Sequence, residues 1–192
     1  MNRRKLLTWL SIVGGSLAAV AALIPFTRYM RPSARAKAKG DPIEVEFSDL
    51  HPGELKTVEW RGRAFWLLRR TPEMLASLPT MAPYLLDTEV PEEEYQPLYV
   101  DQTTRSIEPE LLVVEATCTH LGCIPLRLPN RGDPAVGDWW QGGFFCPCHR
   151  SAYDYAGRVV QRPAPRNLRV PRYRFSSRSA IVIGEDPRAN RT

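Results

Sequence analysis

The hydrophobic positions of this 192-residue chain follow two different patterns, and the first lies at the N-terminus. From Leu6 to Phe26 the sequence reads LLTWLSIVGGSLAAVAALIPF, without a charged residue. An α-helix rises 1.5 Å per residue, so this run would be about 31 Å long as a helix, close to the hydrocarbon thickness of a bilayer. The run is also long for the core of a cleavable signal peptide. We therefore predict one uncleaved transmembrane anchor within residues 1–32.

Beyond residue 42 the hydrophobic positions form short runs rich in β-branched and aromatic residues, as strands do. These runs are Ile43–Phe47, Leu55–Trp60, Ala64–Arg69, Leu111–Ala116, Trp139–Phe145, Arg158–Val160, Tyr173–Ser176 and Ala180–Ile183. They predict an all-β fold of antiparallel sheets over residues 43–184. Thr71 followed by Pro72 is typical of a helix N-cap and first helical position, so we expect a short helix through Leu78. This helix lies in a long insertion of about residues 71–110.

Polar segments flank the predicted β domain. Residues 33–42, SARAKAKGDP, are small or charged and lack apolar periodicity, which is typical of a flexible linker. Residues 185–192 are expected to form a tail. The formal net charge of +5 is spread over both termini and the C-terminal third, and no basic stretch carries interleaved aromatics. Nucleic acid is therefore not an expected partner.

The basic residues before the apolar run are similar to a twin-arginine export signal. Arg3-Arg4 is followed by Lys5-Leu6-Leu7, although Asn2 and Leu6 depart from the usual residues of that signal. A plain basic flank of a membrane helix is the alternative. Basic residues lie on both sides of the run, so their count does not decide its orientation.

Two short loops contain the candidate chemistry of the chain. CTHLGC at Cys118–Cys123 and CPCHRS at Cys146–Ser151 hold all four cysteines and two of the three histidines. Each loop offers a thiolate and an imidazole, a set that suits a two-iron cluster with one cysteine-ligated and one histidine-ligated iron. Two cysteines and two histidines also fit a structural zinc site, and four cysteines in an exported domain fit two ordinary disulfides.

At these loops the chain resembles the Rieske [2Fe-2S] proteins, in particular the iron–sulfur subunits of the cytochrome bc complexes, which are quinol:cytochrome c oxidoreductases. The resemblance also covers Ser151-Ala-Tyr153-Asp154, Pro163-Ala164-Pro165 and the apolar N-terminal segment. Rieske ferredoxins and ring-hydroxylating oxygenases share the ligand pattern but usually lack the extra cysteine pair. The resemblance makes zinc a minor alternative.

The resemblance implies a set of site residues within a cluster-binding subdomain of about residues 117–156. The implied ligands of a single [2Fe-2S] cluster are Cys118, His120, Cys146 and His149, and the implied disulfide joins Cys123 to Cys148. The residues implied to support the cluster are Ser151 and Tyr153 through their hydroxyls, Leu121 as a shield, and the proline loop formed by Pro163, Ala164 and Pro165. The chain departs from the family at Arg150, where the family usually has glycine, and at Arg162, where it often does.

The function implied by the resemblance is that of an electron-transfer subunit that oxidises quinol and passes the electron to a c-type cytochrome. His149 and His120 would act at the quinol, with His149 hydrogen-bonded to it, and residues 33–42 would be the hinge about which the domain moves. The expected partners are a cytochrome b and a c-type cytochrome, in a dimeric complex of the bacterial inner membrane with the β domain in the periplasm. Export after folding agrees with this chemistry, because cluster assembly needs reduced thiolates whereas a disulfide needs an oxidising compartment. The alternative is the small Rieske subunit of a periplasmic molybdenum oxidase such as arsenite oxidase.

Overall fold

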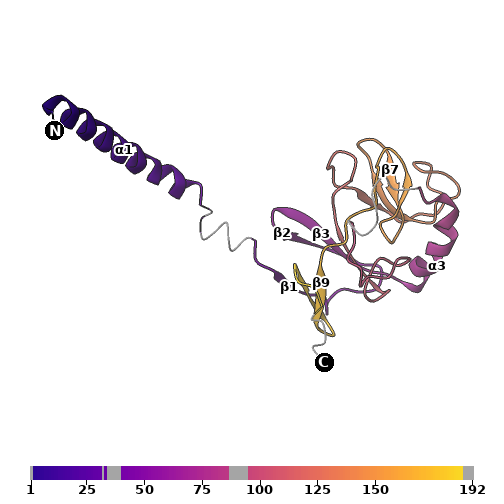
Figure 1. The fold of residues 1–192 in the computed structure, drawn as a ribbon. Coiled ribbons are helices and arrows are strands. Elements are labelled where there is room, and N and C mark those ends of the chain that lie inside the picture. Colours follow the sequence, from indigo (N-terminus) through magenta and orange to yellow (C-terminus); the bar gives the residue numbers. More distant parts are fainter. Residues whose placement is uncertain (1, 32, 34–39, 87–94, 188–192) are drawn as a thin grey trace. The chain divides into compact units, whose positions relative to one another are not determined.

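A computed structural model of the chain describes residues 2–31, 33, 40–86 and 95–187, and the chain divides into two units, Met1–Gly40 and Asp41–Thr192. The first unit contains one helix, α1 (Arg3–Tyr29), of 27 residues (Figure 1). None of its residues is buried, and its length and apolar composition are sufficient to cross a membrane. The predicted N-terminal apolar helix is therefore confirmed. Most of the predicted linker, residues 34–39, and residues 188–192 of the predicted tail lie outside the described residues.

The second unit consists mainly of three antiparallel sheets, which confirms the predicted fold class. The first sheet has the order β1 (Ile43–Glu46), β10 (Ala180–Ile183), β9 (Tyr173–Ser177), and the second β2 (Leu55–Trp60), β3 (Arg63–Arg69), β4 (Leu111–Glu115). The third has the order β5 (Leu126–Leu128), β6 (Gly143–Cys146), β7 (Ser151–Tyr153), β8 (Val159–Gln161). Neighbouring strands along the chain pair directly in the second and third sheets.

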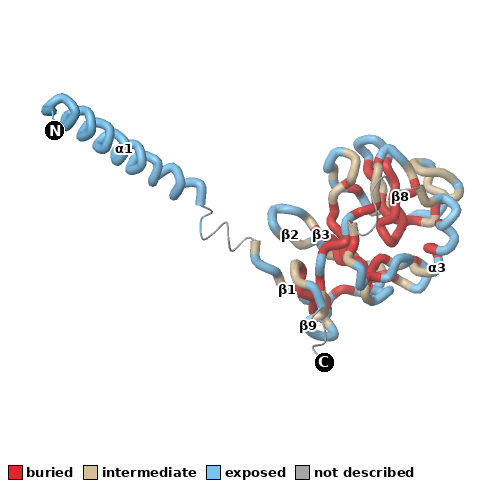
Figure 2. The backbone as a smooth tube through the Cα atoms, viewed as in Figure 1, coloured by how far each residue is buried: buried red, intermediate tan, exposed pale blue. Residues whose placement is uncertain are grey.

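The centre of the core is formed by β3 and β4, where buried residues follow one another without alternation. Figure 2 shows the buried part of β3 in red. All five residues of β4 are buried, because the sheet is covered on both faces. The edge of β4 is covered as well, since Glu115 N–H donates to the carbonyl of Arg169 (2.8 Å). Trp66 of β3 stacks on Phe144 of β6 at 4.9 Å between ring centroids and so joins the second sheet to the third.

The insertion after β3 begins with α3 (Pro72–Met81), followed by the 3₁₀ turn η1 (Ala82–Tyr84). The predicted N-cap is present, because the Thr71 hydroxyl accepts a hydrogen bond from Met74 N–H (3.3 Å). The helix continues three residues beyond the predicted Leu78, since Met81 is fully buried and extends its apolar face. Residues 87–94 of the insertion lie outside the described part of the chain.

Arg70 ties the end of the insertion to the domain. Its buried guanidinium donates to the carbonyls of Pro109, Thr104 and Tyr155 and to the hydroxyl of Ser106. Burial lowers the pKa of Arg70 to about 10, which leaves it charged at neutral pH. These bonds satisfy backbone carbonyls in irregular segments that no sheet reaches.

Seven of the eight predicted strands lie within one residue of the observed bounds, but the strand predicted over Trp139–Phe145 begins only at Gly143. Gly143 has φ +154°, and a Cβ on it would lie 2.1 Å from the carbonyl oxygen of Tyr153, so the backbone there passes directly against β7. Trp140 is fully buried, but it lies before the strand and donates from Nε1 to the carbonyl of Leu128 (3.2 Å). The prediction missed β5 and β7, because these three-residue strands contain no β-branched residue, whereas the equally short β8 contains two.

Candidate metal centre

Two closed loops bring the candidate ligands together. The first follows β4, and Gly122 N–H donates to the carbonyl of Cys118 (2.9 Å), while Cys118 N–H donates to the carbonyl of Cys123 (2.7 Å). The second is the turn between β6 and β7, where Arg150 N–H donates to the carbonyl of Cys146 (2.9 Å). Each loop therefore folds back on the cysteine with which it starts.

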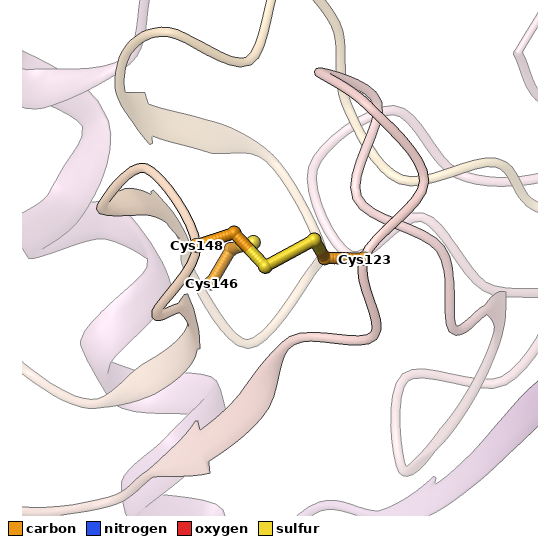
Figure 3. A group of neighbouring side chains, drawn as sticks. All are labelled: Cys123, Cys146 and Cys148. Atoms are coloured by element: carbon orange, nitrogen blue, oxygen red, sulfur yellow. A yellow bond between two sulfur atoms is a disulfide. The ribbon is translucent and has the colours of Figure 1, made fainter.

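A disulfide joins the two loops. It links Cys123 to Cys148, whose Cα atoms are 6.8 Å apart (Figure 3). The sulfur of Cys146 lies close to this bond, because the three sulfurs of Cys123, Cys146 and Cys148 are within 4.8 Å of one another. Two of these sulfurs are used by the disulfide, so Cys146 is the member of this group that can offer a thiolate to a metal.

The other two cysteines are free thiols and belong to the core. Cys118 and Cys146 are only 2 % and 1 % exposed, respectively. Burial raises the pKa of the Cys146 thiol, and the nearby Cys118 thiol raises it further. A thiol must lose its proton to bind iron, and the positive charge of a bound metal would stabilise the thiolates in this buried environment.

The two loop histidines lie side by side. The rings of His120 and His149 are 4.6 Å apart between centroids and nearly perpendicular, at 86°. His120 Nδ1 is buried and has no hydrogen-bond partner among the described residues, whereas His149 is exposed. A buried ring nitrogen without a partner is costly unless it binds something. Two buried thiols and this nitrogen fit a metal cluster with mixed cysteine and histidine ligands.

Tyr153 of β7 donates a hydrogen bond to a candidate ligand. Its hydroxyl lies 3.3 Å from Cys118 Sγ. Burial, together with this bond, raises the pKa of the Tyr153 phenol above its usual value, so the phenol remains protonated and able to donate. The Tyr153 oxygen in turn accepts from Thr119 N–H (3.1 Å), which directs the phenol proton towards the sulfur.

Thr119 and Ser151 connect the two loops to the segment that contains the three proline-loop residues. Thr119 Oγ1 donates to the carbonyl of Arg166 (2.7 Å), and Ser151 Oγ accepts from Ala164 N–H (2.9 Å). Ser151 is fully buried and pairs with Cys146 across β6 and β7, which places it opposite this candidate ligand. Pro163 is exposed and Pro165 half-buried, so Ala164 is the loop residue that packs into the core.

Arg150 follows His149 in a backbone conformation that side chains rarely adopt. Its φ is +67°, in the left-handed region. The exposed guanidinium donates from Nη2 to the carbonyl of Ala135 (2.7 Å), and the Arg150 carbonyl accepts from Gln161 Nε2 (2.6 Å). The structure therefore explains why glycine suits this position, and it shows the arginine side chain fixed to a neighbouring loop.

A buried ion pair supports the end of β7. Asp154 Oδ2 lies 2.6 Å from Arg158 Nη2, and its Oδ1 accepts from the backbone N–H groups of Ala156 and Arg158 (both 2.9 Å). Arg158 also donates to the carbonyl of Leu78 on α3 (3.0 Å). The turn immediately after Tyr153 is thereby fixed to the core.

The site lies at an exposed tip formed by the two loops, in which Leu121, Cys148 and His149 are exposed. Beside the ligands the tip carries apolar side chains, with Leu121 70 % exposed, Ile124 58 % and Leu126 59 %. A groove of about 850 Å³ lies elsewhere on the domain, lined by residues that include Trp60, Leu98, Tyr99 and Arg172. Of the four candidate ligands, His149 is exposed, and it can contact other molecules at the tip.

Thr119, Asp154 and Arg158 also support the site, although no sequence pattern predicted this role. Thr119 lies between two candidate ligands, so its place in the loop is a signal that could have been used. Asp154 was noted only as part of a motif, and no pattern connects it with Arg158. Leu121, predicted to shield the cluster, is placed beside the ligands but largely exposed.

The geometry defines a Rieske-type iron–sulfur protein: two loops with one cysteine and one histidine each, joined by a disulfide, on an antiparallel β domain. The family model for the Rieske [2Fe-2S] domain matches residues 43–174, and the chain belongs to this family.

Two relatives and one solved structure show how far the similarity extends. The chain is 48 % identical over 189 residues to the ubiquinol-cytochrome c reductase iron-sulfur subunit of Allochromatium vinosum, covering 97 % of this chain and 89 % of the relative. It is 38 % identical over 187 residues to the protein of the same name from Bradyrhizobium diazoefficiens, covering 92 % of each. A structure titled "Hyperthermophilic respiratory Complex III" aligns with a TM-score of 0.47 and 25 % identity, covering 89 % of this chain and 98 % of that one.

Membership of the family decides the cofactor. The Rieske domain binds a [2Fe-2S] cluster, which removes the zinc alternative. The molybdenum oxidase alternative finds no support among the relatives described above, since both are named as subunits of ubiquinol-cytochrome c reductase.

Proposed function

We propose that the chain is the electron-transfer subunit of a quinol:cytochrome c oxidoreductase and holds its cluster through Cys118, His120, Cys146 and His149. One observation carries the ligand assignment: two buried free thiols and two adjacent histidine rings meet at one exposed tip, with His120 Nδ1 buried and unpartnered in the described structure. The names of the two relatives supply the reaction, in which quinol gives electrons to a cytochrome c.

Some residues of the tip would bind the cluster, and others would contact the quinol. When bound, the cluster accepts one electron at a time, and histidine ligation places its potential above those of all-cysteine ferredoxins. With Nδ1 turned inward, His120 presents its Nε2 outward, and the exposed ring of His149 lies beside it. These outer nitrogens can hydrogen-bond a quinol and hold its proton. The apolar side chains at the rim exclude water from the contact.

Buried hydrogen bonds beneath the site would adjust the reduction potential of the cluster. Tyr153 donates to Cys118 Sγ, which favours negative charge on this sulfur, and Ser151, opposite Cys146 in the sheet, would donate in the same way. Thr119 orients Tyr153. The disulfide holds the loops that carry the ligands in a fixed relation.

The membrane arrangement forms part of the same proposal. Helix α1 would anchor the subunit in the bacterial inner membrane, with the β domain in the periplasm beside cytochrome b and a c-type cytochrome, in a dimeric complex. Residues 33–42 would act as the hinge, and Arg3-Arg4 would direct export of the folded domain. The exposed Arg150 would then face the partner subunits.

The test of the ligand assignment is metal analysis of the purified full chain. We expect two irons and two acid-labile sulfides per chain and the electron paramagnetic resonance signal of a reduced Rieske cluster. Serine at Cys118 or Cys146 should abolish that signal. Alanine at His51, the third histidine of the chain, which is exposed and lies outside both loops, is the control and should retain it. A full cluster in either serine variant would contradict the assignment.

The reaction is tested by identifying the subunits that co-purify with the chain from its native membrane. Purified from its native membrane with an affinity tag, the chain should bring a b-type and a c-type haem and quinol-dependent reduction of cytochrome c. Co-purification of a molybdopterin subunit instead would favour the alternative oxidase.

A further inference from the structure

The free thiol of Cys146 lies beside the disulfide that joins the two loops. The sulfurs of Cys123, Cys146 and Cys148 are within 4.8 Å of one another (Figure 3). Reacting atoms in near-attack geometry are roughly 3 to 3.5 Å apart, so a shift on the order of 1 Å would bring the Cys146 sulfur to the bond. A candidate iron ligand is therefore next to a bond that thiolates attack.

We propose that Cys146 exchanges into the disulfide whenever its sulfur does not hold iron. A small fraction of the Cys146 thiol gives its proton to water, and this thiolate attacks Cys123 Sγ. The Cys123–Cys146 bond forms as the Cys123–Cys148 bond breaks, and Cys148 leaves as a thiolate that takes up a proton. One disulfide and two thiols remain in each chain, so the exchange needs no oxidant and no reductant.

Several features favour Cys123 as the attacked sulfur. The new bond would still join the two loops, and it would close a loop of 23 residues instead of 25, so the entropy of loop closure hardly changes. A bond between Cys146 and Cys148 would instead close a small ring through Pro147, whose fixed φ limits the adjustment of the backbone. Cys148 is exposed, so water can solvate it as the leaving thiolate.

The exchange would prevent a chain that has lost its cluster from binding a new one. A Cys146 sulfur held in a disulfide cannot bind iron, so the chain could not take up a new cluster until a thiol reductant reversed the exchange. Cluster binding, which occupies the Cys146 sulfur, would protect the native disulfide. This protective role rests on the proposed ligand set, whereas the exchange itself rests only on the positions of the three sulfurs.

A matched pair of variants of the full chain tests the exchange. Cys118→Ser and Cys146→Ser each remove one free thiol, so both should lack the cluster and both keep three cysteines. The variants are kept without oxygen, quenched with acid, alkylated, and mapped for disulfides under non-reducing conditions. In Cys118→Ser we expect a mixture of Cys123–Cys148 and Cys123–Cys146 bonds. Alkylation of Cys148 should be several-fold higher in Cys118→Ser than in Cys146→Ser, because the Cys123–Cys148 bond remains intact in Cys146→Ser.

Two results would overturn the proposal. One is a Cys123–Cys148 bond that persists alone in Cys118→Ser over days. The other is equal entry of Cys118 into the bond in Cys146→Ser, which would mean that the exchange reflects general unfolding. If circular dichroism shows that a variant is unfolded, the wild-type chain freed of iron by anaerobic chelation is mapped instead, and an unchanged bond there would also overturn the proposal. Failure of the proposed ligand set would be recognised separately, from the iron content of the untreated chain.

Discussion

The buried pair of Asp154 and Arg158 offers a strong test of how the structure supports its site. The Asp154 side chain has no solvent exposure, and that of Arg158 has 10 %. The carboxylate accepts two backbone N–H groups through Oδ1 and the guanidinium through Oδ2. Alanine at Asp154 would leave the cation and both N–H groups without their acceptor, directly beside Tyr153.

The expected loss of stability follows from this loss of partners. Breaking a buried ion pair by removing one member costs about 3 to 5 kcal/mol, because the remaining charge stays buried without compensation. For a domain of about 150 residues, each kcal/mol lowers the midpoint of thermal unfolding by roughly 2 to 4 °C. Asp154→Ala should therefore lower the midpoint by roughly 6 to 20 °C. The half-life of the cluster should shorten as well, since the adjacent Tyr153 loses its fixed turn.

A double-mutant cycle separates the pair from its surroundings. The variants are Asp154→Asn, Arg158→Met and the double variant, followed by circular dichroism in the same detergent and at equal cluster content. Each single variant leaves a buried charge, whereas the double variant leaves none. We therefore expect the double variant to lose at least about 2 kcal/mol less than the sum of the single losses. Additive losses, or a shift of less than roughly 3 °C for Asp154→Ala, would refute the reasoning.

Three further variants address the site itself. Tyr153→Phe should lower the reduction potential by tens of millivolts, because a lost hydrogen bond on the order of 1 kcal/mol corresponds to roughly 40 mV for one electron; Tyr155→Phe is the control, and equal potentials in the two variants would contradict this role. Serine at both Cys123 and Cys148 should reduce stability by about 3.5 kcal/mol, the chain-entropy value for the 25-residue loop, and should speed cluster loss. An unchanged midpoint of thermal unfolding would show that the Cys123–Cys148 disulfide does not stabilise the domain. Because φ at position 150 is positive, the free energy of unfolding should be about 1 kcal/mol higher for Arg150→Gly than for Arg150→Ala. Both variants lose the same charge, so redox titration at low salt should give them equal potentials, below that of wild type by up to roughly 40 mV. A potential equal to that of wild type would leave Arg150 without electrostatic effect on the cluster.

The sequence by itself determined the features that local chemistry encodes. An uncharged apolar run of 21 residues is already a membrane-length helix, and Thr71 with Pro72 caps a helix through bonds within one turn. Short β-branched runs indicated seven strands to within one residue, because alternation and burial act on neighbours along the chain. The two ligand motifs are equally local, so family resemblance at the loops identified the cofactor that the family match confirms.

Only the tertiary structure decided how distant segments support the site. Thr119 N–H meets the Tyr153 hydroxyl across 34 residues of sequence, and Arg70 meets the Tyr155 carbonyl across 85. The start of β6 depends on the close approach of Gly143 to β7, and the position of Cys146 beside the disulfide depends on the folding of both loops. No periodicity records such contacts, because they arise from packing among residues brought together only after the sheets have formed.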